Sequence, residues 1–351
     1  MVGCTVDPPI EYETKHLRVG GETEYPLCKG DLDEYEEIID RVETELGFEV
    51  AEPIKVFVYD DDAWWAGGID NCDSDDALGC WKPSSRTIHA THWALEHELV
   101  HAVFGDTRAE PFFEEAISDM YGGMQTRFGT TAPSDNRGYS RRAMDEQTGR
   151  HFVRWLRDRW GEAKLGDLVR APGSEFDDDF EVTYGMTIEA AETIYFDEAP
   201  WGYSSLYECT SPRLRHDAEA TSWRETIDLD CAMNDETRSR GTAGMHVRRT
   251  FDVLEPGYHT ITHTGDAMEI HRCSPERIED AAGQDEHLYD DVPPSHASFP
   301  SGASRYYEGQ QSLDLYMEAG VHEVDLAIYG HGSGSIAIEV FATLGPHPVA
   351  G

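Results

Sequence analysis

Apolar residues recur at steps of three and four in the first part of the chain, and this spacing is typical of helices with one buried face. Residues 31–46 carry such a face and end at Gly47. Residues 145–160 show the same spacing, and Gly161 follows them. Between the two, the run Ile54–Tyr59 is apolar and β-branched, which predicts a strand. We therefore expect helices and strands to be mixed in this part of the chain.

The pattern changes beyond Pro200, where helical spacing fades and short alternating runs are separated by Gly, Ser and Thr. Such runs predict strands. They are expected at residues 226–229, 246–253, 258–263, 267–271, 321–329 and 335–341. We expect the last two to form a hairpin around Gly330–Gly334. The second part of the chain therefore predicts a β-sandwich.

Residues 93–103 predict a helix that carries candidate chemistry. The stretch is mostly apolar, with no Gly or Pro before Gly105. His97, Glu98 and His101 form an H-E-x-x-H pattern, in which the two histidines lie four residues apart on one helix face. Both imidazoles can therefore bind one metal ion, and Glu98 can reach a water bound to that metal.

A second helix is expected over residues 110–121, after a break at Gly105 and Asp106. Glu115 follows His101 by fourteen residues, which is far enough for a turn and a returning helix. Zinc sites with two histidines commonly take a Glu as the third ligand. Asp119 lies one turn beyond Glu115 on the same face, where it can accept the second ring proton of a zinc-bound histidine.

These two segments resemble the gluzincin metallopeptidases. The sequence HELVHAV followed by EEAISD is similar to the thermolysin group, and residues 111–115 resemble the P-x-W-x-E-G segment of aminopeptidase-like gluzincins from bacteria. The resemblance covers about residues 30–197. It implies Zn²⁺ as the cofactor and Glu98 as the general base. It also implies that Asp119 accepts a hydrogen bond from one of the zinc-bound histidines. The implied zinc ligands are His97, His101 and Glu115.

The chain departs from the family pattern at the residue that donates a hydrogen bond to the oxyanion formed from the peptide carbonyl during the reaction. Aminopeptidase-type members carry a Tyr three residues before a Gly, and here Gly149 matches the Gly but Glu146 stands at the Tyr position. Tyr139, Tyr184 or a histidine could take this role, and we expect Tyr139. The G-x-M-E-N motif of the aminopeptidases is absent, so nothing in the sequence supports a site that anchors a substrate amine.

The pattern and the resemblance together predict an α+β fold in three parts. A flexible lead is expected at residues 1–11. A gluzincin-type catalytic domain, with a small sheet lobe and a helical lobe, is expected at residues 12–198, and an all-β sandwich accessory domain at residues 199–351. We expect Thr87–Ala90 to be the edge strand along the active cleft, where an extended substrate can add a strand.

The formal net charge of −41 arises from 28 basic and 69 acidic residues. Nucleic-acid binding needs a basic surface, so nucleic acid is excluded as a partner. The simplest interpretation is a solvated acidic surface that keeps the protein soluble in a salty medium. No apolar run reaches the roughly 18 residues that a membrane-spanning helix requires, so no such helix is expected.

Seven cysteines without a C-x-x-C pair favour disulfides in an exported protein. The segment Met1–Cys4 resembles the end of a bacterial lipoprotein signal, which favours Cys4 as a lipid anchor. Two alternatives stay open: Cys4 pairs with Cys28, or it is free. A lipidated Cys4 leaves six cysteines for three bridges, of which only Cys72–Cys80 is predicted. We expect the protein outside the cytoplasm, either secreted, periplasmic or lipid-anchored at the cell surface.

The function expected from these features is zinc-dependent hydrolysis of peptide bonds, by an endopeptidase that acts on peptides or proteins. One alternative is a catalytically degenerate scaffold that acts as a cell-surface binding protein through its β-domain. A second alternative is an exopeptidase. The intact ligand set favours the enzyme, whereas the missing Tyr favours the degenerate scaffold.

Overall fold

The computed structural model shows an α+β protein that divides into two compact units. The first unit contains residues 1–26, 32–206 and 276–280, and the second contains residues 27–31, 207–275 and 281–351. The structure describes residues 8–22, 27–72, 77–106, 110–124, 126–127, 131–136, 145–171, 176–207, 209–217, 222–239, 244–273, 277–278, 304–330 and 333–342. In these ranges no helix is long and apolar enough to cross a membrane.

The first unit is built on a five-stranded sheet with the strand order β1-β2-β3-β5-β4. β2, β3 and β5 are parallel, and the edge strands β1 and β4 are antiparallel to their neighbours. The strands are β1 (Ile10–Glu13), β2 (Leu17–Glu22), β3 (Ile54–Tyr59), β4 (Gly79–Lys82) and β5 (Thr87–Thr91). β1 begins inside the segment that was expected to be a flexible lead.

The prediction that Thr87–Ala90 forms the sheet edge is wrong. β5 is a fully buried strand between β3 and β4, and β4 is the edge on this side. The sequence concealed β4 because its four residues, Gly-Cys-Trp-Lys, show no alternation of apolar and polar positions. The edge available for pairing is therefore β4.

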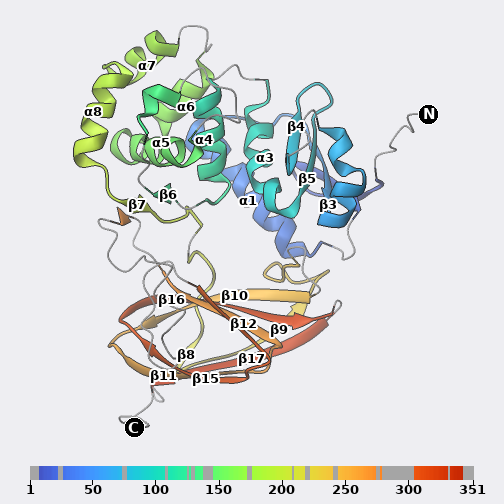
Figure 1. The fold of residues 1–351 in the computed structure, drawn as a ribbon. Coiled ribbons are helices and arrows are strands. Elements are labelled where there is room, and N and C mark those ends of the chain that lie inside the picture. Colours follow the sequence, from blue (N-terminus) through green and yellow to red (C-terminus); the bar gives the residue numbers. More distant parts are fainter. Residues whose placement is uncertain are drawn as a thin grey trace. The chain divides into compact units, whose positions relative to one another are not determined.

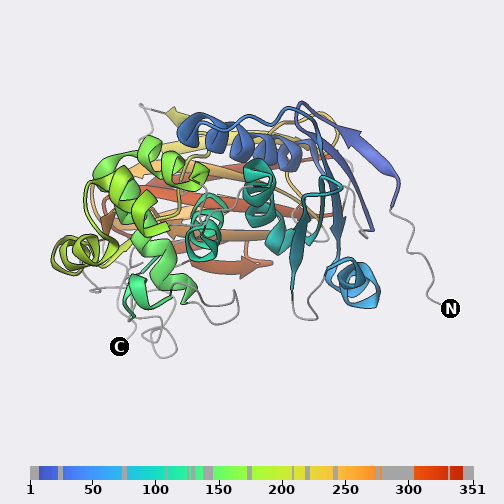
Figure 2. The ribbon, with the colours of Figure 1, turned by 90° about the horizontal axis from the view of Figure 1, so that it is seen from above.

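Three helices flank this sheet, namely α1 (Lys29–Leu46), α2 (Asp61–Ala66) and α3 (His92–Phe104). Figure 2 shows α1 and α3 on one side of the sheet and α2 on the other. Trp64 of α2 is fully buried against Phe57 and Tyr59 of β3. This packing explains why a short helix forms in a stretch that reads as an acidic loop.

The remaining helices of the first unit are α4 (Pro111–Tyr121), α5 (Glu146–Trp160), α6 (Glu162–Arg170), α7 (Phe176–Tyr184) and α8 (Ile188–Glu198). α4 and α5 pack closely because α5 carries Gly149 at the contact. A Cβ atom at Gly149 would lie 3.0 Å from the ring of Phe112 and 3.1 Å from Ala116. A small sheet of β6 (Thr126–Arg127), β7 (Gly202–Tyr203) and β13 (Arg277–Ile278) completes the unit.

The second unit consists of two antiparallel sheets that share one apolar core, as Figure 1 shows. The four-stranded sheet contains, in order, β10 (Gly244–Val253), β16 (Gly320–Tyr329), β12 (Ala267–Arg272) and β14 (Ser304–Glu308). The five-stranded sheet contains β15 (Ser312–Met317), β11 (Gly257–His263), β17 (Ser333–Ala342), β9 (Ser222–Asp230) and β8 (His216–Asp217). Phe251 and Leu326 of the first sheet meet Ile261 and Ile338 of the second in this core.

The hairpin expected around Gly330–Gly334 is not formed. β16 pairs with β10 and β12, whereas β17 pairs with β11 and β9 in the other sheet. Alternation along a strand reports which of its faces is buried, but it does not report which strand lies beside it. Two consecutive strands on opposite sides of a shared core therefore produce the same pattern as a hairpin.

Three disulfides join described cysteines, and their presence suggests an oxidising environment. The predicted pair Cys72–Cys80 is confirmed. Pairing of Cys4 with Cys28 is wrong, because Cys28 is bonded to Cys231. The third bridge joins Cys209 and Cys273, and Cys4 itself lies outside the described residues.

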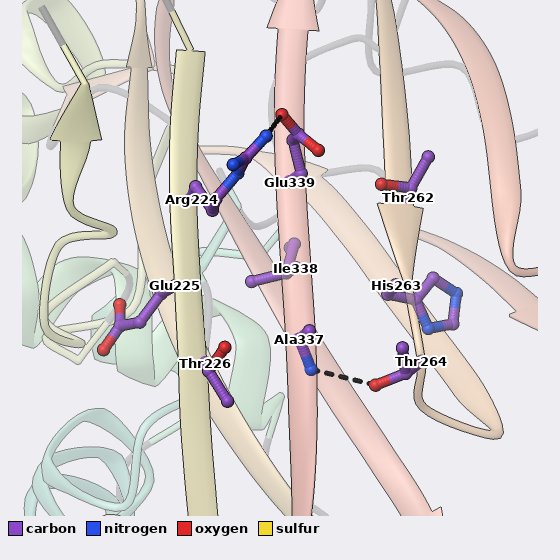
Figure 3. A pocket seen from close by; sticks show the side chains of 9 residues that line it. All are labelled: Arg224, Glu225, Thr226, Thr262, His263, Thr264, Ala337, Ile338 and Glu339. Carbon is purple, nitrogen blue, oxygen red and sulfur yellow. Dashed lines mark hydrogen bonds and ion pairs between the residues drawn. The ribbon is translucent and has the colours of Figure 1, made fainter.

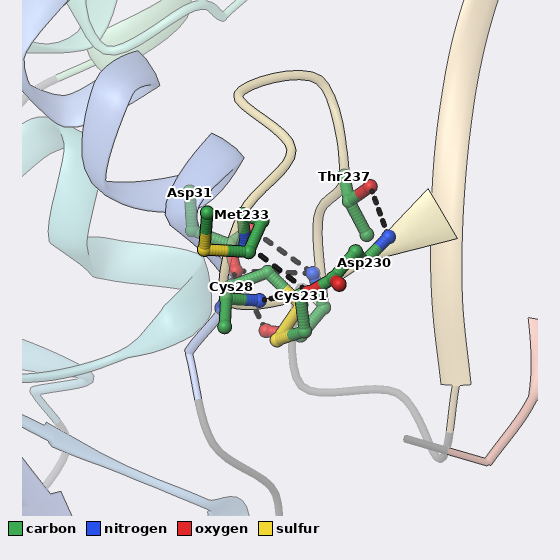
Figure 4. Close-up of a disulfide and its surroundings, with 8 residues drawn as sticks. Cys28, Asp31, Asp230, Cys231, Met233 and Thr237 are labelled. Atoms are coloured by element: carbon green, nitrogen blue, oxygen red, sulfur yellow. Dashed lines mark hydrogen bonds between the residues drawn. A yellow bond between two sulfur atoms is a disulfide. The ribbon is translucent and has the colours of Figure 1, made fainter. Parts of the chain in front are cut away.

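The Cys28–Cys231 bridge belongs to a dense polar cluster in the second unit, drawn in Figure 4. Asp31 is fully buried there, and its carboxylate accepts hydrogen bonds from the backbone of Cys28 at 2.9 Å and from the hydroxyl of Ser239 at 2.6 Å. The amide of Lys29 donates to the carbonyl of Cys231 at 2.8 Å. These bonds satisfy a buried carboxylate that would otherwise be costly.

His322 of β16 is fully buried in the second unit. Its Nε2 donates to the carbonyl of Glu318 at 3.0 Å, and its ring stacks on Phe251 with centroids 5.8 Å apart. Burial lowers the pKa of His322 to about 4, and the nearby Arg272, His259 and His271 act in the same direction. This residue is therefore neutral in the folded protein at neutral pH.

We expect mild acid to weaken the second unit through His322. The folded-state pKa lies below the unfolded value, so the unfolded chain binds the proton first and stability falls as the pH drops. Between the unfolded pKa and about pH 4 this residue should cost up to about 3 kcal/mol of unfolding free energy. Urea unfolding of wild type and His322→Leu, at neutral pH and near pH 5, measures the effect. Wild type should lose more stability than the variant, and parallel losses would contradict the assignment.

Candidate metal centre

The helices α3 and α4 bring the predicted metal ligands together. His97 and His101 come from consecutive turns of α3, and Glu115 comes from the second turn of α4. The Nε2 atoms of the two histidines are 2.9 Å apart. Glu115 Oε2 lies 3.3 Å from His97 Nε2, and Glu115 Oε1 lies 3.5 Å from His101 Nε2. The three side chains thus converge on one point.

The donor set and its spacing fit a zinc ion. Ligand atoms about 2.0–2.1 Å from a tetrahedral metal lie about 3.3 Å from one another. Two of the three observed separations are within a few tenths of an ångström of that value, and the His97–His101 separation is shorter by about 0.4 Å. Three protein ligands leave the fourth position of a tetrahedron open, as in catalytic zinc sites.

Each imidazole is oriented by a carboxylate that binds its Nδ1, the ring nitrogen facing away from the converging Nε2 atoms. His97 Nδ1 donates to Asp119 Oδ1 at 2.7 Å, the arrangement that the sequence predicts. His101 Nδ1 donates to Glu114 Oε1 at 2.9 Å. Both Nδ1 atoms are therefore protonated, which leaves the Nε2 lone pairs free to bind a metal. No local pattern in the sequence predicts this role for Glu114.

Charge couples these side chains strongly. Burial opposes protonation of His97, but the carboxylates of Asp119 and Glu115 outweigh it and raise the pKa of His97 to about 10. Burial also opposes protonation of His101, whose pKa is nevertheless raised by Glu114 and Glu115. The two imidazoles hold the pKa of Glu115 well below its usual range, against the effect of burial. A metal ion must therefore compete with protons here, and its affinity should fall in acid.

Glu98 lies directly beside the edge strand β4. It is buried, with 8% of its surface exposed, although it is one residue from the candidate ligand His97. A Cβ atom at Gly79 of β4 would lie 2.8 Å from Cγ of Glu98 and 3.0 Å from the Cβ atoms of Ala90 and Ala94. Only glycine therefore lets the edge strand pass this close to the candidate base.

The candidate donors to the oxyanion are not brought to this centre by any described contact. Tyr139 lies outside the described residues. Tyr184 is buried in the helical core, with ring centroids 4.7 Å from Phe180 and 5.4 Å from Trp160. Glu146, which stands at the family's Tyr position, has a pKa raised first by burial and then by the charge of Asp119. The Glu146 carboxyl is therefore electrostatically coupled to the centre.

Removal of the Glu114 carboxylate should weaken metal binding. Groups that orient a metal-bound histidine typically contribute about 10- to 100-fold to metal affinity, so Glu114→Ala should raise the Kd for zinc by about that factor. Glu114→Gln keeps an acceptor oxygen for His101 Nδ1 and should have a smaller effect. Competition with a zinc-binding dye measures both, with the exposed Glu189→Gln on α8 as the control. Equal affinities in all four proteins would contradict this role.

Two other groups of potential ligands occur among the described residues, and neither is a credible metal site. In the group of Cys209, His271 and Glu323, the sulfur of Cys209 is already bonded to Cys273. The other group surrounds His16, whose Nδ1 donates to Glu36 at 2.7 Å. A histidine satisfied by a carboxylate in an acidic surface has an adequate structural explanation.

A shallow cavity of about 180 Å³ lies on the five-stranded sheet of the second unit, across β9, β17 and β11 (Figure 3). Arg224 and Glu339 form an ion pair at one end, and Thr264 accepts a hydrogen bond from the backbone of Ala337 at 2.9 Å at the other. None of the side chains predicted to act in catalysis lines this cavity. It therefore has no part in the centre described above.

Comparisons with known proteins do not assign this chain to a family. No protein-family model and no curated protein matches the sequence. Among solved structures, PliG of Aeromonas hydrophila, a periplasmic inhibitor of g-type lysozyme, is 10% identical with a TM-score of 0.22, over 38% of this chain and 96% of that chain. A cycloisomaltooligosaccharide glucanotransferase of Paenibacillus sp., complexed with cycloisomaltoheptaose, is 11% identical with a TM-score of 0.17, over 93% of this chain and 57% of that chain. At these TM-scores neither similarity carries information on fold or function.

Proposed function

We propose that this protein is a zinc-dependent endopeptidase of the gluzincin type. The observation that carries the proposal is the convergence of His97, His101 and Glu115, with both histidines oriented by carboxylates and Glu98 beside them. Buried carboxylates are costly, and a purely structural helix pair gains little from six titratable side chains in one place. A metal-dependent reaction accounts for all of them.

In this proposal each residue has one role. His97, His101 and Glu115 would hold the zinc, which would supply a Lewis acid and make the attacking water more acidic. Glu98 accepts the proton of the attacking water and then delivers it to the leaving amine. Asp119 and Glu114 keep the two imidazoles in the required tautomer and orientation. Tyr139 is the proposed oxyanion donor in this scheme, because Glu146 occupies the position of the family's Tyr.

The substrate is proposed to bind as an extended chain along β4. An edge strand offers unpaired backbone groups, and an extended peptide can add to it as a further strand. β4 passes next to Glu98 at Gly79, so a peptide paired with it would place a backbone carbonyl near the base. Recognition of the peptide backbone rather than of a chain end supports an endopeptidase over an exopeptidase.

The disulfides support a location outside the cytoplasm, where such bonds persist. A secreted, periplasmic or lipid-anchored protein would meet this condition. An extracytoplasmic peptidase also has ready access to peptide and protein substrates.

Turnover of a mixed peptide library with blocked ends tests the proposed function. The zinc-loaded protein should cleave internal bonds, a chelator should abolish cleavage, and added zinc should restore it. Cleavage of a matched library with free ends, but not of the blocked one, would indicate an exopeptidase instead. No cleavage by a zinc-loaded protein would favour the degenerate scaffold, whose function would then reside in the β-domain.

A further inference from the structure

The edge strand β4, on which the proposed substrate would pair, is only weakly supported by its own pairing. It has four residues, all of them partly exposed, and within its sheet it pairs with β5 alone. Segments with little buried apolar surface and exposed backbone hydrogen bonds open easily. Contacts other than strand pairing must therefore hold β4 in place if it is to receive a peptide.

Successive residues of β4 face opposite sides of the sheet, as in any strand. Gly79 faces α3, since a Cβ atom there would lie 2.8 Å from Cγ of Glu98. Trp81 lies on the same face, and its Nε1 donates to the carbonyl of Gly105, directly after α3, at 3.1 Å. Cys80 stands between these two residues and therefore points to the opposite side of the sheet, where α2 lies (Figure 2).

On that side of the sheet, Cys80 is bonded to Cys72. Cys72 packs against the small apolar core around Trp64, which also contains Tyr59 of the central strand β3. The residue before Cys72 is Asn71, whose Nδ2 donates to the hydroxyl of Tyr59 at 3.5 Å. The bridge therefore ties the edge strand to a buried core that is built on the centre of the sheet.

We infer that the Cys72–Cys80 bridge is a positioning element of the proposed peptidase, which holds β4 where a substrate can pair with it beside Glu98. The inference rests on the proposed function and gives a role to a bridge outside the metal centre. The bridge fixes β4 from one face, while Gly79 and Trp81 contact α3 on the other. The backbone groups of β4 are then in place before the peptide arrives. Without the bridge, the peptide must order β4 as it binds, which costs binding free energy.

Steady-state cleavage of one blocked peptide by wild type and by the double variant Cys72→Ser with Cys80→Ser tests the inference. The double variant should raise KM by about tenfold or more and change kcat less, with the zinc content unchanged. Either single serine variant should raise KM as much as the double variant, because the loss of either sulfur breaks the bridge. The matched control is Cys28→Ser with Cys231→Ser, which removes a bridge from the second unit and should keep the wild-type KM.

Hydrogen exchange of backbone amides separates the positioning of β4 from catalysis. Without the bridge, the amides of Gly79–Lys82 should exchange about tenfold faster or more, whereas those of Ile54–Tyr59 in β3 should keep their protection. Unchanged exchange in β4 would overturn the inference. Faster exchange with an unchanged KM, or an equal rise of KM in the control variant, would also overturn it, although the peptidase function would stand. If zinc-loaded wild type cleaves no peptide, the proposed function fails and the positioning role with it.

Discussion

Glu98→Gln is expected to lower kcat on peptide substrates by about 10²- to 10⁴-fold and to leave the zinc content unchanged. Glutamine matches glutamate in size, so the packing of this side chain against Gly79 should be preserved. The amide cannot accept the proton of the attacking water, however, and cannot return it to the leaving amine. KM should change little, because in the proposed binding mode the substrate is held by β4 rather than by Glu98.

Single-turnover and steady-state rates for wild type and Glu98→Gln measure this loss. Glu96→Gln, which removes the same charge two residues earlier on α3, is the matched control and should keep most of the activity. Substantial turnover by Glu98→Gln with a full zinc complement would mean that another group acts as the base. A loss of zinc in that variant would instead mean that Glu98 supports the metal site.

Removal of the Cys28–Cys231 bridge is expected to lower the free energy of unfolding of the second unit by up to about 5 kcal/mol. The bridge joins residues 203 positions apart, so it restricts the unfolded chain more than a short loop would. The double variant Cys28→Ser with Cys231→Ser should unfold at a lower urea concentration. Its loss should be largest in the signal of the second unit, which contains both cysteines.

The Cys72–Cys80 bridge provides the matched comparison, because it closes a loop of only 8 residues in the first unit. Chain entropy predicts about 2.5 kcal/mol for a loop of this length. The corresponding double serine variant should therefore be the milder one and should leave the transition of the second unit in place. Equal losses in the two double variants would contradict the entropic explanation.

Local periodicity was sufficient to predict the helices α1, α3, α4 and α5 and the convergence of the three candidate ligands. A period of 3.6 residues places His97 above His101, and fourteen residues allow Glu115 to return on a second helix. The N-terminal cap of α8 has an equally local signal. Thr187, a residue type favoured at helix N-caps, directly precedes the helix and accepts a hydrogen bond from the amide of Ala190 at 3.3 Å. In each case the signal lies within a few turns of the chain.

Features that depend on distant partners were not predictable. The role of Glu114 was not predicted, because sequence alone does not show that adjacent carboxylates, about 100° apart on α4, can serve two different imidazoles. The sequence of β4 shows no alternation of apolar and polar positions, so this strand was not predicted. β16 and β17 show the alternation expected of a hairpin, although they belong to different sheets. Pairing of Cys28 with Cys231 depends on the folded second unit, not on any local pattern.

The most direct test of the metal centre is the zinc content per chain of wild type and Glu115→Ala, measured side by side by elemental analysis after identical zinc loading and dialysis. Glu115 places Oε2 3.3 Å from His97 Nε2 and Oε1 3.5 Å from His101 Nε2, so its loss removes one of the three candidate ligands. We expect one zinc per chain in wild type and much less in the variant. A wild-type protein that retains no zinc would contradict the metal centre and, with it, the proposed peptidase.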